Sequence, residues 1–198
     1  KPGNHKIFHG DGSVKNIKYW DLEIATEKSD FGENIIEEEI SHLMNSSVSY
    51  RMISDVPVGA FLSGGLDSSI LVSEMSNLTS NQIKTFTTGF KQKEYNEFSF
   101  ANEVANHCNT QHKEVILDVD TYLNSLKTIL MIKDAPLAVP NELALHKLSL
   151  ELSKDITVVL SGEGADELFG GYGRIFRSAY DYQRLIKYGN LIPKELKN

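Results

Sequence analysis

The sequence predicts an α/β domain built on an open parallel sheet with helices on both faces, preceded by a β-hairpin and one helix. Strand-like and helix-like segments alternate between residues 56 and 160. The strand-like segments are short and largely apolar, which is typical of parallel strands covered on both sides. Two of them end in Ser-Gly turns with acidic residues close behind. Because ligands bind beyond the carboxyl ends of such strands, these turns are where a site is expected.

The composition is that of a globular protein with one large domain, or one domain and an appendage. The chain has 198 residues, 40% of them hydrophobic, and a net charge of −7. Scattered basic residues argue against a nucleic-acid track, although backbone N–H groups can still hold a small anion. No apolar run reaches the ~20 residues that span a bilayer. The single cysteine, Cys108, cannot form an internal disulfide, which favours a reducing, cytoplasmic compartment.

The first predicted elements are the hairpin and an amphipathic helix. A turn signal, Gly10-Asp11-Gly12, separates two β-prone runs. Between residues 34 and 52, apolar side chains recur at helical spacing, with three consecutive glutamates on the other side. We interpret these glutamates as a solvated first turn, favoured by the helix dipole, and not as an acidic site.

The remaining elements alternate along the chain. Strands are predicted at residues 56–62, 83–90, 113–117 and 156–160, and helices at 68–77, 98–108, 121–132 and 142–152. Cys108 is expected inside a helix as a buried apolar residue. The histidines at 107, 112 and 146 lack metal-ligand spacing, so we interpret them as surface or packing residues. Residues 133–142 are expected to form a proline-fixed turn capped by Asn141.

The first strand-end turn has the features of a phosphate-binding loop. Its residues are Leu62, Ser63, Gly64, Gly65, Leu66, Asp67, Ser68 and Ser69. The glycines let the backbone approach a ligand, and the following helix offers free N–H groups to an anion. Asp67 would repel phosphate unless a divalent cation lay between them, so it predicts Mg²⁺. The alternative is a glycine turn in which Asp67 and Ser68 merely cap the helix. The loop lacks the lysine of a P-loop and the G-x-G-x-x-G of a dinucleotide site.

The second strand-end turn is acidic. It runs from residue 161 to residue 172 and carries Glu163, Asp166 and Glu167. Such a cluster is costly unless a cation compensates it. If the sheet brings this turn beside the first, Asp67 and Asp166 face one metal–polyphosphate unit. The alternative is a surface turn before a helix whose N-terminus favours acidic residues.

Together the two turns resemble a known family. Residues 63–69 resemble the pyrophosphate loop of the N-type ATP pyrophosphatases, which include GMP, NAD and argininosuccinate synthetases. Residues 161–172 are similar to the synthetase domain of glutamine-hydrolysing asparagine synthetases, with β-lactam synthetase as a close relative. The resemblance implies an adenine nucleotide α-hydrolase-like fold. It also implies that residues 1–32 are the hairpin and linker ending a glutaminase domain, and that residues 33–198 are an ATP-binding synthetase domain without its carboxy-terminal part.

The resemblance implies a carbon–nitrogen ligase that makes asparagine. Aspartate attacks the α-phosphate of ATP, and ammonia then displaces AMP from the β-aspartyl adenylate. The implied partners are ATP, Mg²⁺, aspartate and ammonia from a glutaminase domain absent here, with a homodimer for the full-length protein. Because the family's amino-terminal cysteine is replaced by Lys1, we expect this chain not to hydrolyse glutamine. As a fragment it is expected to bind ATP weakly and to turn over poorly.

The same resemblance assigns residues to roles. The implied ATP contacts are Leu62, Ser63, Gly64, Gly65, Asp67, Ser68, Ser69, Thr88, Ser161 and Gly162. Asp67 and Asp166 match the metal-binding carboxylates. Asp67 and Glu163 are the implied catalytic residues, with Glu163 placed for adenylate formation or for accepting a proton from ammonia.

Two alternatives stay open. A related amidotransferase would keep the adenylation and act on another carboxylic acid, such as a sugar or antibiotic precursor. A degenerate nucleotide-binding module would act as a scaffold or regulator, although the presence of Asp67 and Asp166 argues against it.

Overall fold

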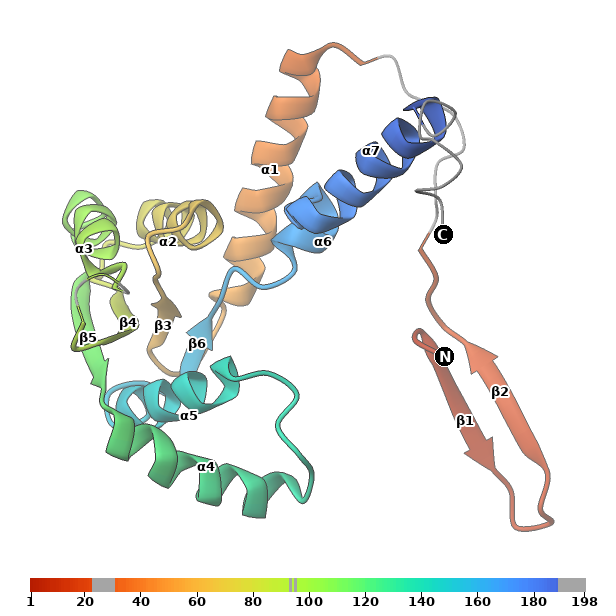
Figure 1. Ribbon diagram of the computed structural model, residues 1–198, viewed down its shortest axis with the longest axis horizontal. Helices are drawn as coiled ribbons and strands as arrows, with labels where there is room; N and C mark the ends of the chain where they lie inside the picture. Colours follow the sequence, from red (N-terminus) through yellow and green to blue (C-terminus); the bar gives the residue numbers. More distant parts are fainter. Residues whose placement is uncertain (23–30, 93, 95, 189–198) are drawn as a thin grey trace, which may run out of the picture. The chain divides into compact units, whose positions relative to one another are not determined.

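The chain divides into two units, Lys1–Ser41 and His42–Asn198. The first unit contains the predicted hairpin, which is confirmed. The computed structural model describes residues 1–22, 31–92, 94 and 96–188. Strands β1 (Asn4–Phe8) and β2 (Val14–Lys18) pair antiparallel (Figure 1). The turn closes through a 2.9 Å bond from His9 N to Ser13 O, with Gly12 at φ +84°. The boundary between residues 32 and 33 stays a prediction.

The second unit contains the predicted parallel sheet. Its strands are β3 (Val58–Phe61), β4 (Lys84–Phe90), β5 (Gln111–Leu117) and β6 (Val158–Leu160). Their order is β5-β4-β3-β6 and every neighbouring pair is parallel. Strand β3 therefore lies between β4 and β6, although β6 follows it much later in the sequence. This order puts the ends of β3 and β6 side by side.

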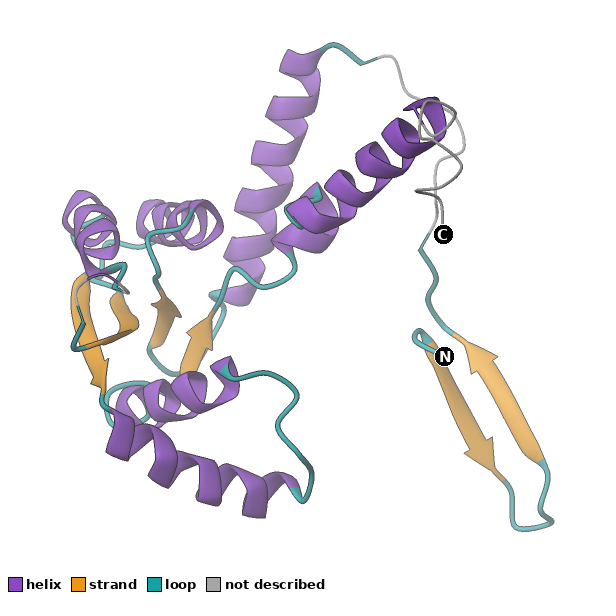
Figure 2. Ribbon diagram, in the orientation of Figure 1, coloured by secondary structure: helices purple, strands orange, loops and turns teal. Residues whose placement is uncertain are grey.

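Helices cover both faces of the sheet, as predicted (Figure 2). The helices are α1 (Glu33–Arg51), α2 (Leu66–Leu78), α3 (Phe98–His107), α4 (Val119–Lys133), α5 (Asn141–Leu152), α6 (Ala165–Phe169) and α7 (Gly173–Tyr188). On one face Met75 of α2 and Ala101 of α3 join Leu62 in the core. On the other face Leu148 of α5 packs with Phe86 of β4. The described part of the chain has no helix long and apolar enough to cross a membrane.

Three local expectations differ from the structure. Helix α1 forms, but of its apolar stripe Ile35, Ile36, Ile40 and Leu43 are exposed, and only the later Val48 is fully buried. Cys108 packs against the core as expected, yet it sits at the C-cap of α3 and is half-buried. Asn141 does not cap α5, because the N-cap position belongs to Pro140 and has no side-chain hydrogen bond.

Candidate nucleotide site at the ends of β3 and β6

The turn after β3 is held in shape by its own serines. Ser63 Oγ accepts a hydrogen bond from Gly65 N at 3.1 Å and lies 3.0 Å from Ser68 Oγ. Ser68 Oγ in turn accepts from Ser63 N at 3.2 Å, and Ser69 Oγ donates to Gly65 O at 2.7 Å. The loop is therefore preorganised by bonds that do not depend on a ligand.

The alternative in which Asp67 and Ser68 cap α2 is wrong. The N-cap residue is Gly65, and it has no side-chain cap. An α-helix leaves the N–H groups of its first turn without intrahelical partners. These groups and the positive end of the helix dipole would attract an anion at the start of α2. The Asp67 side chain is exposed at the same place.

Gly64 brings the first turn against the start of α3. Its φ is +81°, a conformation that side chains rarely adopt. A Cβ atom on Gly64 would lie 2.6 Å from the carbonyl carbon of Phe100 and from Ala101 N. Glycine is thus required here both by backbone conformation and by the close approach of α3.

The turn after β6 leads into the one-turn helix α6. Gly164, at φ +97°, is the N-cap of α6, and Gly170, at φ +74°, is its C-cap. Asp166 O accepts from Gly170 N at 2.9 Å and from Gly171 N at 3.1 Å. The glycines that the sequence clusters here are therefore the residues that let the chain fold back sharply around Asp166.

The structure brings the two turns into contact, as the strand order requires. Val58 pairs with Val158, and Ala60 with Leu160. A Cβ atom on Gly162 would lie 3.1 Å from Asp67 Cβ and 3.2 Å from Ser68 N. The prediction that the sheet places these turns beside each other is confirmed.

Carboxylates gather around a tyrosine that the sequence did not single out. Tyr172 OH donates to Glu167 Oε1 at 2.5 Å. This bond, assisted by the negative charges of Glu167, Asp166 and Glu163, raises the pKa of Tyr172 to about 12. The same bond lowers the pKa of Glu167. Tyr172 is the last residue of the acidic motif. Its closeness in the sequence to several carboxylates was the available signal for this hydrogen bond.

The carboxylates on the two turns are of the chemical type that can hold a cation together with phosphate. No group of three or more His, Cys, Asp or Glu side chains that could hold a metal ion occurs in the ranges the structure describes. Mg²⁺ is commonly held by one or two carboxylates together with substrate phosphates and water. Exposed Asp67 and half-buried Asp166 are the carboxylates that the sequence predicts as ligands, and they lie on the two adjoining turns.

Thr88 lies near the carboxyl end of β4, next to the strand that carries the first turn. Its Oγ1 is buried and has no hydrogen-bond partner among the described residues. A buried hydroxyl without a partner is uncommon, because the lost hydrogen bond costs about 1–3 kcal/mol. Thr88 Oγ1 is thus a buried polar group whose hydrogen-bonding capacity is unused among the described residues.

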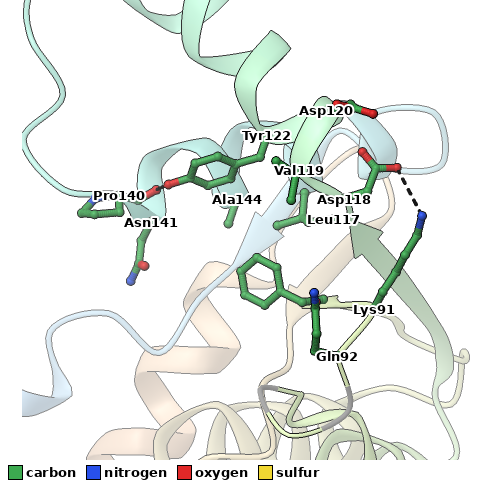
Figure 3. Close-up of a pocket in the computed structure, with 11 residues that line it drawn as sticks. Lys91, Gln92, Leu117, Asp118, Val119, Asp120, Tyr122, Pro140, Asn141 and Ala144 are labelled. Atoms are coloured by element: carbon green, nitrogen blue, oxygen red, sulfur yellow. Dashed lines mark hydrogen bonds and ion pairs between the residues drawn. The ribbon is translucent and has the colours of Figure 1, made fainter.

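A separate cavity of about 490 Å³ lies at the ends of β4 and β5 (Figure 3). Its walls are formed by Phe90, Lys91, Gln92, Leu117, Asp118, Val119, Asp120, Tyr122, Pro140, Asn141 and Ala144. Tyr122 OH donates to Pro140 O at 3.3 Å, and Lys91 Nζ is 3.9 Å from Asp118 Oδ2. No predicted site residue lines it. Its residues come from three separated segments without a local motif, so sequence patterns could not assemble it.

The strand order and the adjoining turns define an α/β domain whose fold is similar to that of a solved NAD⁺ synthetase. The glutamine-dependent NAD⁺ synthetase from Acinetobacter baumannii, solved in complex with ADP, superposes with a TM-score of 0.52. The alignment covers 84% of this chain and 31% of that chain at 19% sequence identity. At this identity the likeness concerns the fold.

The chain belongs to the asparagine synthase family, because the sequence model of that family, described as Asparagine synthase, matches residues 39–197. Asparagine synthetase [glutamine-hydrolyzing] 1 of Bacillus subtilis is 37% identical over 197 residues, covering 100% of this chain. A putative asparagine synthetase [glutamine-hydrolyzing] of Mycobacterium tuberculosis is 38% identical over 160 residues, covering 81% of it. Both relatives are named as glutamine-hydrolysing synthetases. The chain spans only 30% and 24% of their lengths.

Proposed function

We propose that this chain forms the nucleotide-binding part of a glutamine-hydrolysing asparagine synthetase. The observation that carries the proposal is the contact of Gly162 with the first turn of α2, next to Asp67 and Ser68. It puts an anion-binding helix N-terminus and an acidic turn at one edge of the sheet. A magnesium–triphosphate needs both.

The proposed reaction has two steps. A carboxylate oxygen of aspartate attacks the α-phosphorus of ATP, the bond to the bridging oxygen breaks, and pyrophosphate leaves. Ammonia then attacks the carbonyl carbon of the β-aspartyl adenylate, AMP departs, and the nitrogen loses a proton to give asparagine. The first step turns a poor electrophile into one with a good leaving group.

The residues of the first turn would hold the departing pyrophosphate. Backbone N–H groups at the start of α2 and the serine hydroxyls face the negative charge that grows on the leaving group. Leu62 and Thr88 are proposed to line the nucleotide pocket. In support, Thr88 Oγ1 is buried and has no described partner. Ser161 and Gly162 would contact the nucleotide from the second turn.

Asp67 and Asp166 are the proposed Mg²⁺ ligands. A bound Mg²⁺ would neutralise phosphate charge and act as a Lewis acid on the α-phosphorus. Glu163 is exposed on the second turn and is proposed to accept the proton from ammonia, which is mostly ammonium at neutral pH.

Further parts of the proposal concern the whole protein. Residues 1–32 are proposed to end a glutaminase domain that supplies ammonia, and the full-length protein is proposed to be a homodimer in the cytoplasm. The single cysteine, Cys108, suits a reducing compartment.

The test is aspartate-dependent exchange of labelled pyrophosphate into ATP by the full-length protein. Exchange that requires aspartate supports the proposal. Exchange only with another carboxylic acid would mean that this acid, and not aspartate, is the acceptor. The absence of exchange with any acid would refute adenylation. Asp67→Asn should abolish the exchange. Asp134→Asn is the matched control, because Asp134 sits in the left-handed C-cap of α4, a conformation that Asn tolerates.

A further inference from the structure

A series of hydrogen-bonded side chains joins β4 to β5, next to the turn after β3. Thr85 and Thr87 are buried, and they face the same side of β4 because they are two residues apart. His112 of β5 lies between them. Its Nδ1 is 2.9 Å from Thr85 Oγ1, and its Nε2 is 3.2 Å from Thr87 Oγ1. Thr85 Oγ1 is also 2.8 Å from Thr110 Oγ1.

This series of hydrogen-bonded side chains ends at the backbone carbonyl of Leu62, where the turn after β3 begins. Thr87 Oγ1 donates its proton to Leu62 O. A carbonyl oxygen can only accept and a hydroxyl has one proton, so Thr87 Oγ1 must accept from His112 Nε2. The imidazole is then protonated on Nε2, and its bare Nδ1 accepts from Thr85. With a neutral ring, this arrangement satisfies both nitrogens of His112 and the hydroxyls of Thr85 and Thr87.

The electrostatics of His112 agree with a neutral ring. Burial lowers the pKa of His112, and the opposing effect of the negative charge of Glu114 is smaller. A neutral imidazole keeps Nδ1 free to accept from Thr85.

Both backbone groups of Leu62 are thereby tied to β4. Leu62 N donates to Phe86 O at 2.9 Å, and Leu62 O accepts from Thr87. Leu62 is the last residue before Ser63, whose side chain and N–H organise the turn. The direction in which the chain enters the turn depends on these two bonds.

We infer that Thr87 and His112 are positioning residues for the nucleotide site: His112 orients the Thr87 hydroxyl, which holds the Leu62 carbonyl and so fixes the phosphate-binding turn. This inference rests on the proposed nucleotide-binding function. It assigns a role to a histidine that the sequence marks only as a packing residue.

The first test compares Thr87→Val with Thr87→Ser in the full-length protein. Valine keeps the shape and removes the hydroxyl, whereas serine keeps the hydroxyl. Calorimetric titration with Mg·ATP, without any acceptor acid, should show a Kd raised roughly three- to tenfold in T87V, as for one lost hydrogen bond. T87S should stay near the wild-type Kd. Equal Kd values for the two variants would overturn the inference.

The role of His112 is tested with a substitution that restores a hydrogen-bond donor. His112→Gln returns an amide donor near the Nε2 position, so it should bind Mg·ATP better than His112→Leu. Combining H112L with T87V should weaken binding no more than T87V alone, because both act through one chain. Additive losses would contradict that coupling.

A measurement on unmodified protein covers the case in which variants do not fold. Nitrogen NMR of histidine-labelled wild-type protein should show His112 protonated on Nε2 and bare on Nδ1, and the opposite tautomer overturns the inference. Wild type that binds Mg·ATP without aspartate-dependent exchange refutes the proposed acceptor but not this positioning role. Wild type that binds no Mg·ATP refutes both.

Discussion

Gly162, two residues beyond the end of β6, lies so close to Asp67 in the first turn of α2 that a Cβ atom on Gly162 would be 3.1 Å from Asp67 Cβ. The two residues belong to different strand-end turns, and their contact rests on the pairing of β3 with β6. A nucleotide bound at one turn would therefore also meet the other. This makes Gly162 the most direct probe of whether the two turns act together.

Gly162→Ala should weaken Mg·ATP binding while leaving the protein folded. The added Cβ requires shifts of only a few tenths of an ångström at Asp67 and Ser68, but it separates groups proposed to act on one ligand. We expect a loss in affinity of roughly tenfold, since small displacements in such sites are expensive. Gly173→Ala is the control, because nothing lies within 4 Å of a Cβ there. Wild-type affinity in G162A would mean that the turns bind independently.

Gly64→Ala should destabilise the fold itself. The substitution forces a side chain into φ +81° and against the backbone of Phe100 and Ala101 at 2.6 Å. The conformational part alone lowers the free energy of unfolding by about 1–3 kcal/mol. Urea denaturation measures the loss. Gly65→Ala should cost much less, because its Cβ would meet only Ser63 Oγ at 3.2 Å.

Removing either proposed metal ligand should remove the magnesium dependence of ATP binding. In wild type, chelation of Mg²⁺ by EDTA is expected to lower ATP affinity by roughly tenfold or more, as for the loss of charge-assisted contacts. In Asp67→Asn and Asp166→Asn the affinity should already be low and should respond little to Mg²⁺. A full magnesium response in both variants would exclude these carboxylates as ligands.

The phenol of Tyr172 should ionise at a higher pH than a free phenol. Its hydrogen bond to Glu167 raises its pKa to about 12, against about 10 for a free phenol. An ultraviolet titration of wild type minus Tyr172→Phe should thus show one phenol ionising near pH 12. Because the folded-state pKa is raised, the stabilisation is complete below about pH 10 and is lost as the pH rises through 12. A difference curve centred near pH 10 would show that the bond is absent in solution.

The core around α2 should be sensitive to truncation in a way that surface positions are not. Met75 is fully buried, whereas Met131 on α4 is 75% exposed. Met75→Ala should lower the free energy of unfolding by about 2–5 kcal/mol, because the cavity it leaves cannot fully collapse. Met131→Ala should change it by less than about 0.5 kcal/mol. Thermal melts of the pair check the difference, and equal melting temperatures would contradict the packing of this face.

The alternation of strands and helices could be predicted because burial on both faces makes each parallel strand a short apolar run. The ends of the strands were harder to predict from the sequence where polar residues continue the strand pairing. Strand β5 begins at Gln111, two residues before the predicted start, because Gln111 and His112 pair with Lys84 and Thr85. Helix α7 was not predicted, although its sequence repeats apolar residues at helical spacing.

The turns at the candidate site were visible in the sequence because glycines and acidic residues mark them locally. Their contact could be inferred only as a consequence of strand order, which depends on long-range pairing. The roles of Thr87 and His112 could not be predicted, although threonines two residues apart in β4 were a signal. Which carbonyl a buried hydroxyl meets is decided by the neighbouring strand, and no local pattern encodes that.

The pairing of β3 with β6 also bears on how the protein acquires its site during folding. The register joins Val58 to Val158, so forming it closes a loop of about 100 residues. Such distant contacts carry a large entropic cost and tend to form after local ones. A nascent chain emerging from the ribosome could build the hairpin of β1 and β2 and the first strand–helix units early. It would gain the complete edge of the proposed nucleotide site only after Leu160 had been synthesised and docked.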